Sequence, residues 1–175
     1  SEYMFLDNTA CNLASVNLRK FFSEDDNIFD VRGFEYTVRL WTTVLEISVL
    51  MAQFPSKEVA QLSYDYRTLG LGYANLGALL MSNGHAYDSD RGRADAGAIT
   101  ALMTGRAYRQ SALIAEAVGV HEAYPINAEP QLNVMQMHRD AVEQIDDACP
   151  PYLKQASSSL WNEVLQQGRK HGFRN

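Results

Sequence analysis

Three glycines lie close together in the stretch Tyr66-Arg67-Thr68-Leu69-Gly70-Leu71-Gly72-Tyr73-Ala74-Asn75-Leu76-Gly77-Ala78-Leu79-Leu80. The first two suit the Gly-x-Gly-x-x-Gly motif of dinucleotide-binding proteins, but Asn75 stands where that motif needs its third glycine. A strand rich in Val and Ile does not precede them either. Close packing of helices through small residues explains the stretch better, and we expect its glycines to interrupt or flank a helix that ends at Asn83-Gly84.

Helix signals dominate the chain on both sides of this stretch. After the N-cap candidate Asp30, apolar residues recur at steps of three and four until Pro55, which predicts a long amphipathic helix. Further helices are expected from near Ser56, from Asp88-Ser89-Asp90 to Gly119, from Gln131 to Asp146, and from a cap at Ser157–Ser159 to Gly172. Residues 3–22 suit a loop and a strand instead. From these patterns alone, the chain is expected to be mostly α-helical.

Length and charge narrow the class of protein. The 175 residues fit a single domain, 1–175, that is large enough to bury a core without disulfides or a structural metal. The formal net charge of −6 argues against binding to polymeric nucleic acid, which needs clustered Lys and Arg. Apolar runs stay shorter than the ~18 residues of a membrane span, so we expect neither a span nor export.

The residues able to do chemistry are few. Cys11 and Cys149 are too few for a disulfide scaffold, which favours a reduced, cytoplasmic setting. The four histidines show no paired spacing of the kind that binds metal, so no metal site is predicted. Arg67 is expected to be a surface or packing residue, and His138 a core or boundary residue. The Tyr and Trp side chains mainly occupy positions typical of a helical core.

Four stretches together resemble ribonucleotide reductase, specifically its catalytic subunit. They are Ser1-Glu2 with Asn8-Thr9-Ala10-Cys11-Asn12-Leu13-Ala14-Ser15-Val16-Asn17-Leu18, the glycine stretch Tyr66–Leu80, Met137-His138-Arg139, and His171-Gly172-Phe173-Arg174-Asn175. Their order agrees with the family, and the resemblance runs essentially from end to end. The segment Leu-Gly-Leu-Gly-Tyr-Ala-Asn-Leu-Gly is most similar to the adenosylcobalamin-dependent (class II) branch.

The resemblance implies an α/β fold, in which the chain is a helix-rich internal segment of a ten-stranded α/β barrel. The family's radical-bearing Cys would fall immediately before Ser1, and its Ala-Pro-Thr-Gly-Thr phosphate loop would follow Asn175. We therefore expect an internal part of a larger enzyme. Inteins interrupt such enzymes at this kind of junction, so an intein is one hypothesis for where the sequence begins.

Two site residues follow from the resemblance, Glu2 and Cys11. In an extended segment side chains alternate, so Asn, Cys and Glu at every second position would all face one way. In the family that Cys becomes a thiyl radical that removes the 3′-hydrogen of the nucleotide, and Glu2 would be the general base on the 3′-hydroxyl. Cys11 matches one of two cysteines that reduce the substrate radical and end as a disulfide. Without the resemblance, Glu2 would be read as a solvated terminal residue and Cys11 as a buried structural thiol.

The expected activity is conversion of ribonucleotides to 2′-deoxyribonucleotides, with adenosylcobalamin as the source of the radical. The expected partners are the ribonucleotide substrate, a thioredoxin-like or dithiol reductant, and the remaining portions of the parent reductase. The residues that bind the cofactor are not identified, and the isolated segment is expected to be inactive and to self-associate through exposed strand edges and apolar faces. Two alternatives remain: the large subunit of a metal-dependent reductase, and a non-catalytic helical structural or interaction domain.

Overall fold

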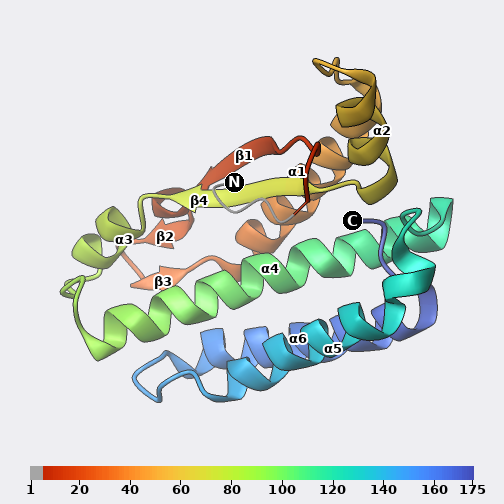
Figure 1. Cartoon of the computed structure of the whole chain (residues 1–175). Helices are drawn as coiled ribbons and strands as arrows, with labels where there is room; N and C mark the ends of the chain where they lie inside the picture. Colours follow the sequence, from red (N-terminus) through yellow and green to blue (C-terminus); the bar gives the residue numbers. More distant parts are fainter. Residues whose placement is uncertain (1–5) are drawn as a thin grey trace.

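The fold, seen in a computed structural model that describes residues 6–175, is layered (Figure 1). Strands β1 (Asn12–Asn17) and β4 (Leu69–Ala74) form a parallel pair on one side of the molecule. Helix α1 (Val31–Met51) packs against both strands and against the long helix α4 (Asp90–Val118). On the other side of α4 lie α5 (Tyr124–Glu143) and α6 (Pro151–His171). The sheet and the outer helices are thus separated by α1 and α4.

Short elements connect these layers. A 3₁₀ helix, η1 (Leu18–Phe21), follows β1 and leads into the small antiparallel pair β2 (Phe22–Ser23) and β3 (Ile28–Phe29). Helix α2 (Lys57–Tyr66) precedes β4, and α3 (Leu76–Ser82) follows it. The β1–β4 register pairs Asn12 with Leu69 and Asn17 with Ala74. Because both strands run the same way, their amino ends meet at one edge of the molecule.

Helix α4 is buried on more than one side, because it lies between α1 and α6. This position explains its small residues: a Cβ added at Gly105 would lie 3.1 Å from Nε1 of Trp161 and 3.2 Å from Leu160. Trp161 is buried and donates a 3.0 Å hydrogen bond from Nε1 to the carbonyl of Ala101. Gly105 therefore sets how closely α4 and α6 approach.

The helices predicted after Asp30, Ser56 and Ser89 are confirmed. Asp30 accepts a hydrogen bond from the amide of Gly33, Ser56 from that of Val59, and Ser89 from that of Gly92. Each is a side-chain N-cap of the kind expected. A β-strand in residues 3–22 is confirmed by β1. The long, mostly helical chain with a short parallel sheet agrees with the expected helix-rich α/β segment.

Three expectations about elements are wrong. The stretch 69–74 is not packed helix but strand β4, and α3 begins only at Leu76. Pairing with β1 overrides the low strand propensity of Gly70 and Gly72. Helix α6 begins at Pro151 rather than at a Ser157 cap, because proline suits the first turn of a helix. Helix α5 begins at Tyr124, ahead of the expected Gln131, again with a proline in its first turn.

No helix among residues 6–175 is both long and apolar enough to cross a membrane.

Candidate functional site

Cys11 lies immediately before the amino end of β1 and is half-buried. A Cβ added at Gly70, on the neighbouring strand β4, would be 2.4 Å from Sγ of Cys11 and 2.3 Å from the carbonyl oxygen of Asn12. Sγ of Cys11 therefore packs against bare backbone, which only glycine provides. Gly70 is paired with Leu13, whose side chain is 65% exposed, whereas Ala14 and Val16 are buried on the helix side.

The residues that precede β1 are bonded to neighbouring elements. The amide of Ala10 donates to Oγ of Ser63 in α2 at 2.8 Å, and its carbonyl accepts from Oγ1 of Thr68 at 3.0 Å. Asn12 donates from Nδ2 to the carbonyl of Leu45 at 2.8 Å in α1. The segment that carries Cys11 is thus held by α1, α2 and β4 together.

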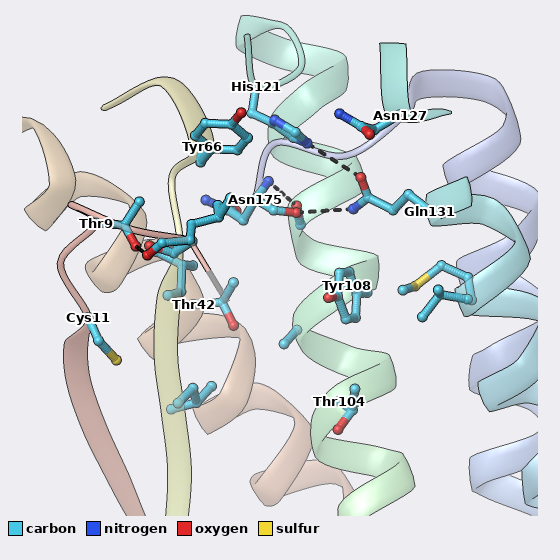
Figure 2. Close-up of a pocket in the computed structure, with 18 of the residues that line it drawn as sticks. Thr9, Cys11, Thr42, Tyr66, Thr104, Tyr108, His121, Asn127, Gln131 and Asn175 are labelled. Atoms are coloured by element: carbon cyan, nitrogen blue, oxygen red, sulfur yellow. Dashed lines mark hydrogen bonds between the residues drawn. The ribbon is translucent and has the colours of Figure 1, made fainter. Parts of the chain in front are cut away.

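A cavity of about 710 Å³ opens beside this segment (Figure 2). It lies between the amino end of β4 and helices α1, α4 and α5, and Cys11, Thr42, Tyr108 and Asn175 all line it. Among the described residues that line it, none is Asp, Glu, Lys or Arg. The cavity therefore suits uncharged groups, and its walls do not supply an anion-binding site of Lys and Arg.

His121, Gln131 and Asn175 are joined at one end of the cavity, as the dashed lines in Figure 2 mark. Nε2 of His121 lies 3.4 Å from Oε1 of Gln131, and Nε2 of Gln131 donates to the carbonyl of Asn175 at 3.4 Å. Burial lowers the pKa of His121, and the positive charge of Arg174 lowers it further, although the hydrogen bond with Gln131 opposes the shift. Burial also raises the pKa of Tyr108. Both groups are therefore held in their uncharged forms near neutral pH.

A buried ionic cluster borders the cavity. Of the two positions expected for Arg67, the surface is wrong, because the side chain is buried in this cluster. Arg67 is only 1% exposed, and its Nε donates to both carboxylate oxygens of Glu46, at 2.8 and 3.0 Å. Arg174 also donates to Glu46 from Nε at 2.9 Å, and Asn175 donates to it from Nδ2 at 2.5 Å. One carboxylate therefore joins α1, the residue that caps the end of α2, and the end of the described chain.

Few features of the sequence point to this cluster. Glu46 falls on the inner face of α1, where the helical period predicts an apolar residue. A charged residue on a buried helix face is a signal that a partner of opposite charge lies nearby. The sequence could have raised that question, but it could not have identified partners 21 and 128 positions away.

Glu2, the other site residue expected from the resemblance, falls outside the described residues. Cys149 is buried in the core beneath α4, where burial raises the pKa of its thiol. Within residues 6–175, His, Cys, Asp and Glu form no group of three or more able to hold a metal ion. His138, expected in the core or at its boundary, is exposed and stacks on the buried Trp161 ring with centroids 5.2 Å apart.

Comparison with known proteins shows which family this chain resembles. The family model of the ribonucleotide reductase barrel domain matches residues 1–175. A protein of Bradyrhizobium diazoefficiens named vitamin B12-dependent ribonucleotide reductase is 50% identical over all of this chain, and one of Streptomyces coelicolor with the same name is also 50% identical over all of it. The large chain of ribonucleoside-diphosphate reductase of Cryptosporidium parvum is 25% identical over 99% of the chain.

The chain spans only 15% of the length of the Bradyrhizobium relative and 19% of the Streptomyces relative. The match nevertheless covers every residue of the chain and includes both the Cys11 segment and the β4 glycines. The chain therefore belongs to the ribonucleotide reductase family, as part of its barrel domain.

Proposed function

We propose that this chain is part of a ribonucleotide reductase that converts ribonucleotides to 2′-deoxyribonucleotides, and that Cys11 is one of its redox thiols. The observation that carries the proposal is the placement of Cys11: its Sγ lies against Gly70, where the paired strands begin, next to a cavity of neutral lining. The full-length family match supports the same reaction.

The proposed role of Cys11 is to supply reducing equivalents. Two thiols lose two electrons and two protons as one S–S bond forms, while the 2′ carbon of the ribose loses its hydroxyl as water and gains a hydrogen. The second thiol belongs to the longer protein. A thioredoxin-like or dithiol reductant then restores both thiols by exchange. Glu2, outside the described residues, is proposed as the general base that takes the proton of the 3′-hydroxyl.

The longer protein is proposed to depend on adenosylcobalamin, since relatives about half identical to this chain are named vitamin B12-dependent. The large chain of the diphosphate reductase is only 25% identical, which supports the cobalamin branch over a metal-dependent one. When bound, adenosylcobalamin supplies a carbon-centred radical.

The described residues do not themselves fit a corrin ring. A corrin carries amide groups around its whole rim, whereas His121, Gln131 and Asn175 bond to one another and much of the remaining lining is apolar. We therefore assign the cofactor's contacts to other parts of the longer protein and derive no step through it.

The segment 1–175 is also proposed to self-associate. The outer face of α1 presents a row of exposed large apolar side chains: Tyr36, Leu40, Val44, Ile47 and Met51. These residues recur at steps of three and four and form one stripe, which soluble proteins usually cover. Sedimentation of the wild type should show dimers or larger species, and Leu40→Glu with Ile47→Glu should shift it to monomer. A wild type that stays monomeric at high concentration would refute the idea.

The setting proposed for the longer protein is the cytoplasm, where thioredoxin-like reductants operate and buried thiols such as Cys149 stay reduced.

The proposed redox role is tested with Cys11→Ser in the longer protein, assayed with adenosylcobalamin and a dithiol. Multiple turnover should be lost while the fold, followed by circular dichroism, is kept. Cys149→Ala is the matched control, because it removes the other thiol of this chain and should leave turnover per folded molecule unchanged. Full turnover by Cys11→Ser would instead favour the alternative of a non-catalytic structural role for this thiol.

A further inference from the structure

Cys11 precedes the ladder of β1 with β4, whose first pair is Asn12 with Leu69. The residue before Cys11 is held by two side-chain hydrogen bonds, one to each backbone group of Ala10. Oγ of Ser63 accepts from its amide, and Oγ1 of Thr68 donates to its carbonyl. Ser63 lies in α2 and Thr68 in the connection from α2 to β4, so the two residues flank Arg67 in sequence.

Ser63 and Thr68 are themselves held in place. The carbonyl of Ser63 accepts from the amide of Arg67 at 2.9 Å, which ends helix α2. Arg67 adopts a left-handed conformation with φ of +52°, and its side chain is anchored on the buried Glu46. An Arg in this conformation is rare and is kept only where its surroundings hold it. The hydroxyl of Thr68 is therefore aimed by a rigid neighbour.

On the other side of Cys11 is Gly70. Its bare Cα leaves the space that Sγ occupies, and its amide donates to Oδ1 of Asn12 at 3.3 Å. Sγ of Cys11 is thus bounded by Gly70 on one side, and by a backbone clamped at Ala10 on the other. Such restraint is what a thiol needs when it must meet a second thiol at disulfide geometry, because the two Cβ atoms have to lie about 3.5–4.5 Å apart.

We propose that Ser63 and Thr68 are positioning residues for Cys11, which hold Ala10 so that Sγ rests over Gly70 in a single orientation. An effect of these residues on turnover rests on the proposed redox function of Cys11. Their positioning of Cys11 does not depend on that function, since it concerns only the mobility and reactivity of the thiol. Neither side chain touches the reacting atoms, so both act through the backbone of Ala10.

The test uses the longer protein and the variants Ser63→Ala and Thr68→Val, each of which removes one hydrogen bond with little change in volume. The probe is iodoacetamide, and the rate at which Cys11 is alkylated is read by peptide mass spectrometry. Loss of one such bond should raise that rate between about twofold and about tenfold. Thr68→Ser, which keeps the hydroxyl, should restore the wild-type rate.

Thr42→Val is the matched control, since Thr42 lines the same cavity but donates only to Val38 within its own helix. Wild-type alkylation rates in both Ser63→Ala and Thr68→Val, or an equal rise in Thr42→Val, would overturn the proposal. If Thr68→Val fails to fold, Ser63→Ala decides, because a smaller side chain there creates no clash.

Turnover separates this proposal from the redox function. If Cys11→Ser abolishes multiple turnover, Ser63→Ala and Thr68→Val should lower multiple turnover more than a single turnover by pre-reduced protein. If alkylation changes in the variants while Cys11→Ser turns over normally, the positioning stands and the redox role fails. Loss of turnover in Cys11→Ser, with alkylation and turnover of both positioning variants unchanged, would refute the positioning alone.

Discussion

At the scale of single residues, Gly70 and Gly72 occupy the same face of β4 but have different surroundings. A Cβ at Gly70 would meet Asn12 and Cys11 at 2.3 and 2.4 Å, whereas at Gly72 it would meet only Oγ of Ser15, at 4.0 Å. We predict that Gly70→Ala lowers the free energy of unfolding by about 1–3 kcal/mol through overpacking, and that Gly72→Ala changes it by less than about 1 kcal/mol. Urea unfolding of both variants measures this, and equal effects would contradict it.

His121 gives a prediction about pH at the same scale. Burial and the charge of Arg174 lower the pKa of its imidazole from 6.5, so the folded state binds fewer protons than the unfolded state. The stability that the neutral ring contributes is fully present above pH 6.5, and is lost as the pH falls from 6.5 through the lowered pKa. We predict that His121→Asn flattens this part of the stability profile. Denaturant unfolding at pH 7 and pH 5 tests it, and an unchanged slope in the variant would count against it.

At the scale of elements, the crossing of α4 and α6 depends on Gly105, while Gly97 in the same helix has more room. A Cβ at Gly97 would lie 3.8 Å from Ile145, an ordinary contact, but at Gly105 it would press on Trp161 and Leu160. Gly97→Ala should therefore stabilise the protein by up to about 1 kcal/mol through helix propensity. Gly105→Ala should increase the stability of the protein by less than this, or decrease it. Thermal unfolding compares the two variants. A larger increase in stability for Gly105→Ala would show that α6 shifts easily to make room for the added methyl group.

The elements also show what the sequence could and could not predict. Helices with a side-chain cap and an apolar period, such as α1 after Asp30, were predicted close to their observed bounds because their signals are local. Strand β4 was missed, because Leu69–Ala74 becomes a strand only through β1, which lies more than fifty positions earlier. The site divides in the same way. Cys11 is predicted as a site residue from the family resemblance, whereas Ser63, Thr68 and Glu46 act through contacts that no local pattern contains.

At the scale of the whole molecule, Glu46 joins the layers. Its carboxylate is buried and faces the guanidinium groups of Arg67, which caps the end of α2, and of Arg174, near the end of the described chain. Glu46→Gln leaves those two positive charges without a counter-charge. We predict a loss of about 3–5 kcal/mol in the free energy of unfolding, as for other broken buried ion pairs. Equilibrium unfolding measures it.

The control for this prediction is the exposed pair of Arg93 with Asp88, whose removal by Asp88→Asn should cost less than about 1 kcal/mol. A similar small cost for Glu46→Gln would mean that water reaches the cluster and that the layers hold together without it.

The parallel pairing of β1 with β4 also has a kinetic consequence. The loop between Asn12 and Leu69, which contains α1 and α2, must close before the two strands can pair. Helices α5 and α6, in contrast, follow one another directly in sequence. Closing a long loop costs entropy before any contact repays it, so the α4–α6 layer should assemble first and the strand pair last. During unfolding, the strand pair should therefore open first. The amide protons of β4 should then exchange with solvent sooner than those in the middle of α4, and the Cys11 segment would be exposed in each such opening while the helices stay folded.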